Sequence, residues 1–235
     1  MNDADQITPP KPCTGDATHA VVRAGLGSIP LVGAAATELF NWLFKPPMER
    51  RRDEWMREVG ECLMTLEGKH GVDLTRLRDD DSFFDVVMQA THVALRNSHA
   101  EKREALRNAI LNTALPQAPE GSQRQMFLNY VDVFTVWHLR LLHLFDDPPK
   151  WFRENAKPWP NQYMGSRTAV LDAAYLELRD QRDLYDQVWR DLHARGLVGT
   201  DSLHGMVSEV GLGQGLTTTS GKTFLAFISE PTPTK

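Results

Sequence analysis

The sequence predicts a mainly α-helical protein, made of a multi-helix body and a small C-terminal unit that contains a short β-hairpin. Three observations indicate this fold class. Apolar residues recur at helical spacing in segment after segment of the chain. The segments carry the capping and stop residues of helices, and short stretches rich in Pro or Gly separate them.

The composition is that of an ordinary globular protein, with 41% apolar and 24% charged residues. A net charge of -5 provides no general attraction for nucleic acid or an anionic membrane. The two cysteines, Cys13 and Cys62, lie in unlike contexts, which favours a reducing, cytoplasmic location. Residues 1–20 lack the basic start and apolar stretch of a signal peptide, and we expect a disordered leader there.

A helical body is expected over residues 21–145. Its first helix begins near Pro30, and Pro46-Pro47 is expected to end it and to open the next. That second helix ends at Gly68 or Gly71. It buries one stripe of apolar residues, which consists of Trp55, Val59, Cys62, Leu63 and Leu66.

Three further helices complete the expected body. The helix after Asp81 or Ser82 is apolar almost all round, which predicts a central position. The helix from Ala100 is amphipathic and is closed by Pro116. Residues 121–145 are expected to form a single long helix, the most buried of the body.

A connector rich in Pro and Trp, residues 146–166, marks the expected domain boundary. One or two helices follow and end at Gly196, and residues 230–235 form a tail.

The stretch over residues 167–229 resembles a winged-helix domain. Eight residues carry the resemblance: Leu192, Gly196, Leu197, Leu216, Thr217, Gly221, Phe224 and Leu225. It implies that Gly196 adopts a left-handed helix cap and that Gly211, Gly213 and Gly215 lie in a hairpin. A closing helix, capped by Thr219 or Ser220, would then bury Phe224, Leu225, Phe227 and Ile228.

The same glycine-rich stretch is not a phosphate-binding loop. Five residues separate Gly215 from Gly221, where that motif requires four, and Leu216 occupies the position of its glycine. Only a dozen residues follow Thr223, which leaves no room for the parallel sheet. We therefore expect no nucleotide partner.

The charge of the C-terminal unit argues against nucleic acid as a partner. Residues 166–235 contain seven basic and nine acidic side chains, a balance of -2. The helix in the recognition position carries three aspartates, Asp183, Asp186 and Asp191. Winged helices also serve as protein-interaction or structural modules, and we favour those roles.

No catalytic, cofactor-binding or metal-binding residues are predicted. The run Asp79-Asp80-Asp81 is interpreted as helix capping, and the histidines do not converge at ligand spacing. Sequence motifs of hydrolases and metalloproteases are absent from the sequence.

Residues 25–44 form an apolar segment followed by basic residues, and two interpretations are open. The first is a membrane-seeking hairpin, and the second is a core or subunit-interface helix. We favour the second, with Leu39, Phe40 and Leu43 facing the body. The possible interaction face consists of Leu39, Phe40, Trp42, Leu43, Phe44, Arg50, Arg51 and Arg52.

The sequence therefore predicts a cytoplasmic, non-catalytic protein that acts through protein partners or self-association, as an accessory or effector subunit. The segment up to residue 166 also resembles, loosely, hypothetical bacterial helical proteins, which adds no function. Two alternatives remain. One is a membrane-associating effector that uses residues 25–44 as a peripheral anchor, and the other is a winged-helix DNA-binding regulator.

Overall fold

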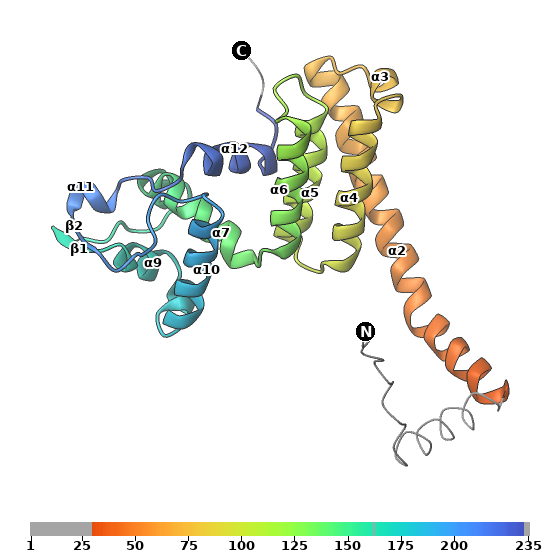
Figure 1. Cartoon of the computed structure of the whole chain (residues 1–235), viewed down its shortest axis with the longest axis horizontal. Coiled ribbons are helices and arrows are strands. Elements are labelled where there is room, and N and C mark those ends of the chain that lie inside the picture. Colours follow the sequence, from red (N-terminus) through yellow and green to blue (C-terminus); the bar gives the residue numbers. More distant parts are fainter. Residues whose placement is uncertain (1–29, 162, 233–235) are drawn as a thin grey trace, which may run out of the picture. The chain divides into compact units, whose positions relative to one another are not determined.

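The computed structural model describes residues 30–161 and 163–232, and these residues are mainly helical, as predicted (Figure 1). By compactness the chain divides into two units, Met1–Asp53 and Glu54–Lys235. The expected leader, residues 1–20, and the start of the apolar segment lie outside the described residues.

One long helix, α2 (Pro30–His70), is followed by shorter helices and one small antiparallel sheet. The sheet pairs β1 (Met164–Ser166) with β2 (Met206–Ser208). The remaining helices are α3 (Leu74–Arg78), α4 (Asp81–Arg96), α5 (Ala100–Thr113), α6 (Gly121–Val133), α7 (Val136–Asp146), α8 (Pro148–Glu154), α9 (Thr168–Ala174), α10 (Arg182–Ala194), α11 (Glu209–Leu212) and α12 (Thr219–Ile228).

Helix α2 is continuous through Pro46-Pro47, so the prediction of two separate helices was wrong. Proline has a fixed φ that suits a helix, and its cost comes from the missing N–H and from ring contacts with the preceding turn. The missing donors leave the carbonyl groups of Trp42 and Leu43 without helical partners. Both residues are exposed, so solvent can bond these groups. The helix ends as predicted, because Gly71 adopts a φ of 63° after His70.

Helix α5, and not α4, occupies the centre of the larger unit. It packs against α4, α6 and α12, and it buries Leu106 and Ile110 completely. Helix α4 instead leaves Phe84 and Met88 exposed, so the prediction of a central α4 was wrong. Polar side chains of α5 can lie in this central position because they bond main-chain carbonyl groups, which offsets the cost of their burial.

Those bonds stabilise the C-terminal ends of other helices. The amide of Asn108 donates to the carbonyl of Ile228 over 3.0 Å, and the amide of Asn112 lies 2.8 Å from the carbonyl of Ser229. Lys102 donates to the carbonyl of Asp132, near the end of α6, over 2.9 Å. Each bond satisfies a carbonyl group that has no partner within its own helix.

Residues 121–145 form two helices rather than one. The break lies at Phe134, whose backbone is extended, and Thr135 begins α7 as its N-cap. Thr135 and His138 form a capping box, in which the backbone N–H of Thr135 donates to Nδ1 of His138 over 3.1 Å. The ring of Phe134 is buried in the core. The apolar spacing continues across residue 134, so the periodicity did not predict this break.

The end of the chain matches the prediction in part. Gly196 has a φ of 68°, and Leu197 is buried behind it. Helix α12 buries Phe224, Leu225, Phe227 and Ile228 as expected, but its N-cap is Thr218, whose hydroxyl accepts from the N–H of Gly221 over 3.0 Å. Neither Thr219 nor Ser220 caps it.

The three glycines expected in a hairpin lie elsewhere. Gly211 belongs to α11, and Gly213 follows that helix as its C-cap. Gly215 passes so close to Asp146 that an added Cβ would lie 2.2 Å from its carbonyl oxygen. Close backbone approach, and not hairpin geometry, therefore explains a glycine at position 215.

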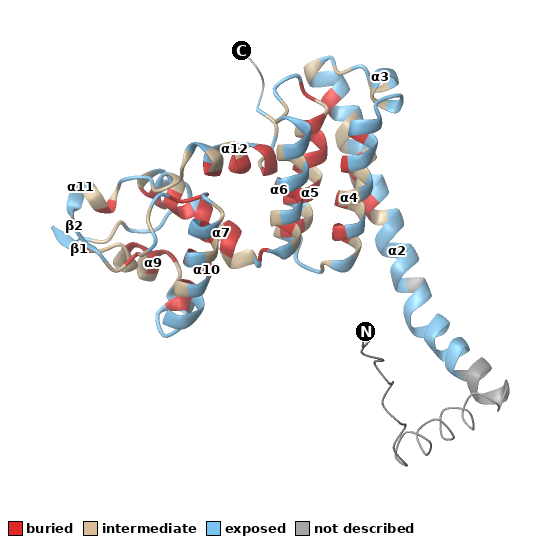
Figure 2. Cartoon of the chain, viewed as in Figure 1, coloured by how far each residue is buried: buried red, intermediate tan, exposed pale blue. Residues whose placement is uncertain are grey.

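The expected connector, residues 146–166, contains α8 and β1. Its Phe152 is buried in the hydrophobic core of the larger unit, and the partly buried Trp159 packs against that core. The buried residues of Glu54–Lys235 lie along the facing sides of α4, α5 and α6 and along α7, α10 and α12 (Figure 2).

Candidate functional site

The predicted interaction face lies on α2, and its large apolar side chains are exposed (Figure 2). Leu39 is 56% exposed, Phe40 59% and Trp42 74%. Leu43 and Phe44 are exposed at 46% and 49%, and the rings of Phe40 and Phe44 lie 4.8 Å apart. We call these five residues the apolar face. Such a concentration of exposed large apolar side chains is typical of an interaction surface.

The basic residues after the apolar face are also exposed. Arg52 forms an ion pair of 3.2 Å with Asp53. Residues 36–53 contain four basic side chains, Lys45 and Arg50–Arg52, and three acidic ones, Glu38, Glu49 and Asp53, so their net charge is only +1. The segment is therefore nearly balanced in charge.

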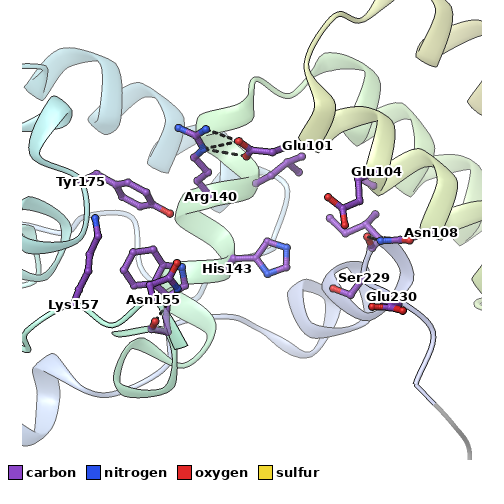
Figure 3. Close-up of a pocket in the computed structure, with 14 residues that line it drawn as sticks. Glu101, Glu104, Asn108, Arg140, His143, Asn155, Lys157, Tyr175, Ser229 and Glu230 are labelled. Atoms are coloured by element: carbon purple, nitrogen blue, oxygen red, sulfur yellow. Dashed lines mark hydrogen bonds and ion pairs between the residues drawn. The ribbon is translucent and has the colours of Figure 1, made fainter. Parts of the chain in front are cut away.

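A second candidate is a pocket of about 500 Å³ in the larger unit (Figure 3). Helices α5 and α7 form one side of it, and α8, Tyr175 and the residues after α12 complete it. Its polar lining includes Glu101, Glu104, Asn108, Arg140, His143, Asn155, Lys157, Ser229 and Glu230. The volume is within the range of pockets that hold small molecules.

The two cationic side chains that line the pocket, Arg140 and Lys157, both bond other parts of the larger unit. The guanidinium of Arg140 bonds both carboxylate oxygens of Glu101, with Nε lying 3.1 Å from Oε1 and 3.0 Å from Oε2. Lys157 donates to the carbonyl of Ala174 at the end of α9, and its ammonium lies 5.7 Å from the ring centres of Trp151 and Tyr175. Both interactions join elements that are distant in sequence.

Burial changes the pKa of two groups in this pocket. Desolvation raises the pKa of the Tyr175 hydroxyl, so this group stays protonated. The side chain of His143 is exposed, although the protein packed around it lowers the pKa of its imidazole by desolvation. A neutral imidazole and a neutral phenol can both exchange hydrogen bonds with a polar ligand.

Sequence reasoning identified none of these pocket residues as a site. They come from four helices and three further chain segments, and no short motif connects them. The Trp- and Pro-rich stretch that contains Trp151 was the one available signal, and it was interpreted as a connector. The pocket forms where these separate elements pack against one another.

The other sequence features have structural roles in the described chain. Asp80 caps α4 by accepting from the N–H groups of Ser82 and Phe83, so the capping interpretation of the aspartate run is confirmed, although the cap is neither Asp81 nor Ser82. Lys222 is exposed in the first turn of α12. On α10, Asp186 lies 2.7 Å from Nε2 of His204.

No protein-family model, curated protein or solved structure matches the chain. Within residues 30–161 and 163–232, none of the helices combines the length and the hydropathy that a bilayer crossing requires. Over the same ranges, His, Cys, Asp and Glu side chains do not gather in a group of three or more able to hold a metal ion.

Proposed function

We propose that this protein acts by binding another protein chain through the apolar face of α2, without catalysing a reaction. The observation that carries the proposal is the joint exposure of Leu39, Phe40, Trp42, Leu43 and Phe44 on one helix. Exposed apolar area of this kind is costly in water, and docking against a partner removes the cost.

The composition of the apolar face supports this role. Trp and Phe are enriched where protein interfaces concentrate their binding energy, and this face holds one Trp and two Phe within five positions. The adjacent arginines would then lie at the rim, where charges contribute to orientation more than to affinity.

Two alternatives have less support. An anionic membrane would be attracted by the arginines, but three acidic residues nearly balance them in residues 36–53. A DNA-binding role for the C-terminal unit would place α10 against phosphates, and α10 carries Asp183, Asp186 and Asp191.

Site-specific photo-cross-linking tests the proposal directly. A photoreactive amino acid at position 40 of the full chain should give a discrete protein adduct, because this side chain would be buried in the contact. The same probe at Asn41, which lies about 180° from the line midway between Leu39 and Leu43, serves as the matched control. Equal labelling at both positions, or adducts with lipid alone, would contradict the proposal.

A further inference from the structure

We propose that the partner bound by the apolar face is a second copy of this chain, held in an antiparallel helix pair whose two-fold axis crosses the seam at the level of Asn41. This inference rests on the proposed function and names its partner. The spacing of the apolar residues, their flanking side chains and the sign of the neighbouring charges support it.

The apolar residues follow the spacing of a helix-pairing seam. Ala36, Leu39 and Leu43 are separated by three and four positions, and Val32 precedes them by four. This alternation is the repeat by which two helices interdigitate their side chains. All four positions belong to α2, and Ala36, Leu39 and Leu43 are exposed along it.

Aromatic residues border this seam on both sides. With 3.6 residues per turn, Phe40 and Trp42 lie about 80° to either side of the line midway between Leu39 and Leu43. A second helix seated on Leu39 and Leu43 would therefore be covered by a large ring on each flank. An identical helix supplies matching rings in return, since a two-fold interface uses the same patch twice.

The charges favour the antiparallel orientation. In a parallel pair, each residue would be level with the same residue of the second copy. Arg50, seven positions after Leu43, would meet itself at the centre of the seam. In an antiparallel pair centred near Asn41, Leu39 packs on Leu43 of the second copy. Arg50 is then level with position 32 of the second copy, so the two arginines no longer meet.

Sedimentation velocity of the full chain, over about a hundredfold range of concentration, measures this association. We expect a reversible dimer. Leu43→Glu places a charge in the seam and should weaken the dimer at least about 100-fold, since each copy loses a buried leucine. Asn41→Glu adds the same charge on the opposite side of α2, and it should change the dissociation constant less than about threefold.

Cysteine pairing tests the orientation. In a Cys13→Ser, Cys62→Ser background, chains with Leu39→Cys are mixed with chains carrying Leu43→Cys and oxidised. An antiparallel seam gives the mixed 39–43 disulfide as the main product. A parallel seam gives 39–39 and 43–43 disulfides instead, and that result would overturn the orientation.

Three outcomes overturn the second copy as partner. They are a monomer at every concentration, equal dimerisation of L43E and N41E, and apolar-face-dependent binding to phosphatidylcholine–phosphatidylglycerol vesicles by a monomeric chain. If the chain is monomeric but position 40 still cross-links to a different protein, the second copy is excluded and the proposed function stands. If neither association nor protein cross-linking occurs, both proposals fail.

Discussion

Nε2 of His138 on α7 lies 3.4 Å from Oδ2 of Asp191 on α10, although 53 residues separate them. Because Nδ1 of the same ring accepts from the N–H of Thr135, the proton of the neutral imidazole is on Nε2 and points to the carboxylate. The ring also stacks on Phe134 at 4.6 Å. One buried histidine thus starts α7 and joins it to α10.

This arrangement predicts a loss of stability in mild acid. Burial lowers the pKa of His138, against an opposing effect from Asp191, and burial also lowers the pKa of His143. The unfolded chain then binds protons more readily than the folded chain. Stability is therefore complete above the ordinary histidine pKa, about 6.5, and declines as the pH falls below it. Urea unfolding at about pH 7.5 and about pH 5.5 measures the decline.

His138→Gln is the matched variant for this prediction. Glutamine is a usual residue at this position of a capping box, so it keeps the acceptor for Thr135 and removes the titrating group. The decline should become smaller without vanishing, since His143 remains. An unchanged pH dependence would show that His138 does not contribute to it.

Phe134→Ala should lower the free energy of unfolding by about 3–5 kcal/mol, because the ring is enclosed and an alanine would leave a cavity. Its neighbours include His138 at 4.6 Å, Tyr130 at 5.6 Å and Phe224 at 6.1 Å between ring centres. Phe84→Ala is the control, since Phe84 is 59% exposed. The control should cost less than about 1 kcal/mol. Similar losses for both variants would contradict the described core.

Gly221→Ala should destabilise the protein by about 1–3 kcal/mol. An ideal Cβ at this position would lie 2.1 Å from the carbonyl oxygen of Leu197, so α12 would have to move away from Leu197. Gly60→Ala in α2 meets no atom within 4 Å and should stabilise by about 0.5–1 kcal/mol. Thermal unfolding of both variants checks the opposite signs. A stabilised G221A would refute the close approach.

Asn112→Ala should cost about 1–2 kcal/mol, because its amide lies within 3.1 Å of the carbonyl oxygens of Ala226, Phe227 and Ser229 at the end of α12. Asn41→Ala, at an exposed position of α2, should change stability by less than about 0.5 kcal/mol. Urea unfolding of the two variants compares them. Equal free energies of unfolding would mean that these hydrogen bonds make no net contribution to stability.

Local signals in the sequence predicted the fold class and most helices. Helical periodicity with cap and stop residues located α4, α5, α10 and the C-terminal end of α2. The errors arose where contacts between residues distant in sequence determine which residues are buried and where a helix ends. Polar residues of α5 are buried because they bond the end of α12, more than a hundred residues later. The break at Phe134 depends on a capping box that uses histidine in place of the usual glutamate.

The two candidate sites also differ in how far the sequence predicted them. The apolar face lies on consecutive turns of one helix, so its residues were predictable from sequence, whereas its exposure was not. The pocket gathers side chains as far apart as Glu101 and Glu230. No periodicity connects such residues, and their meeting depends on how the helices pack.

Removing residues 1–44 tests the central claim, that the apolar face is a contact surface and not part of the core. We predict that the shortened chain keeps a cooperative urea transition with an unchanged midpoint, because the compact unit begins at Glu54. It should also lose all concentration-dependent association in sedimentation velocity. Loss of the cooperative transition would show that the segment belongs to the core, and a folded chain that still associates would show that the contact lies elsewhere.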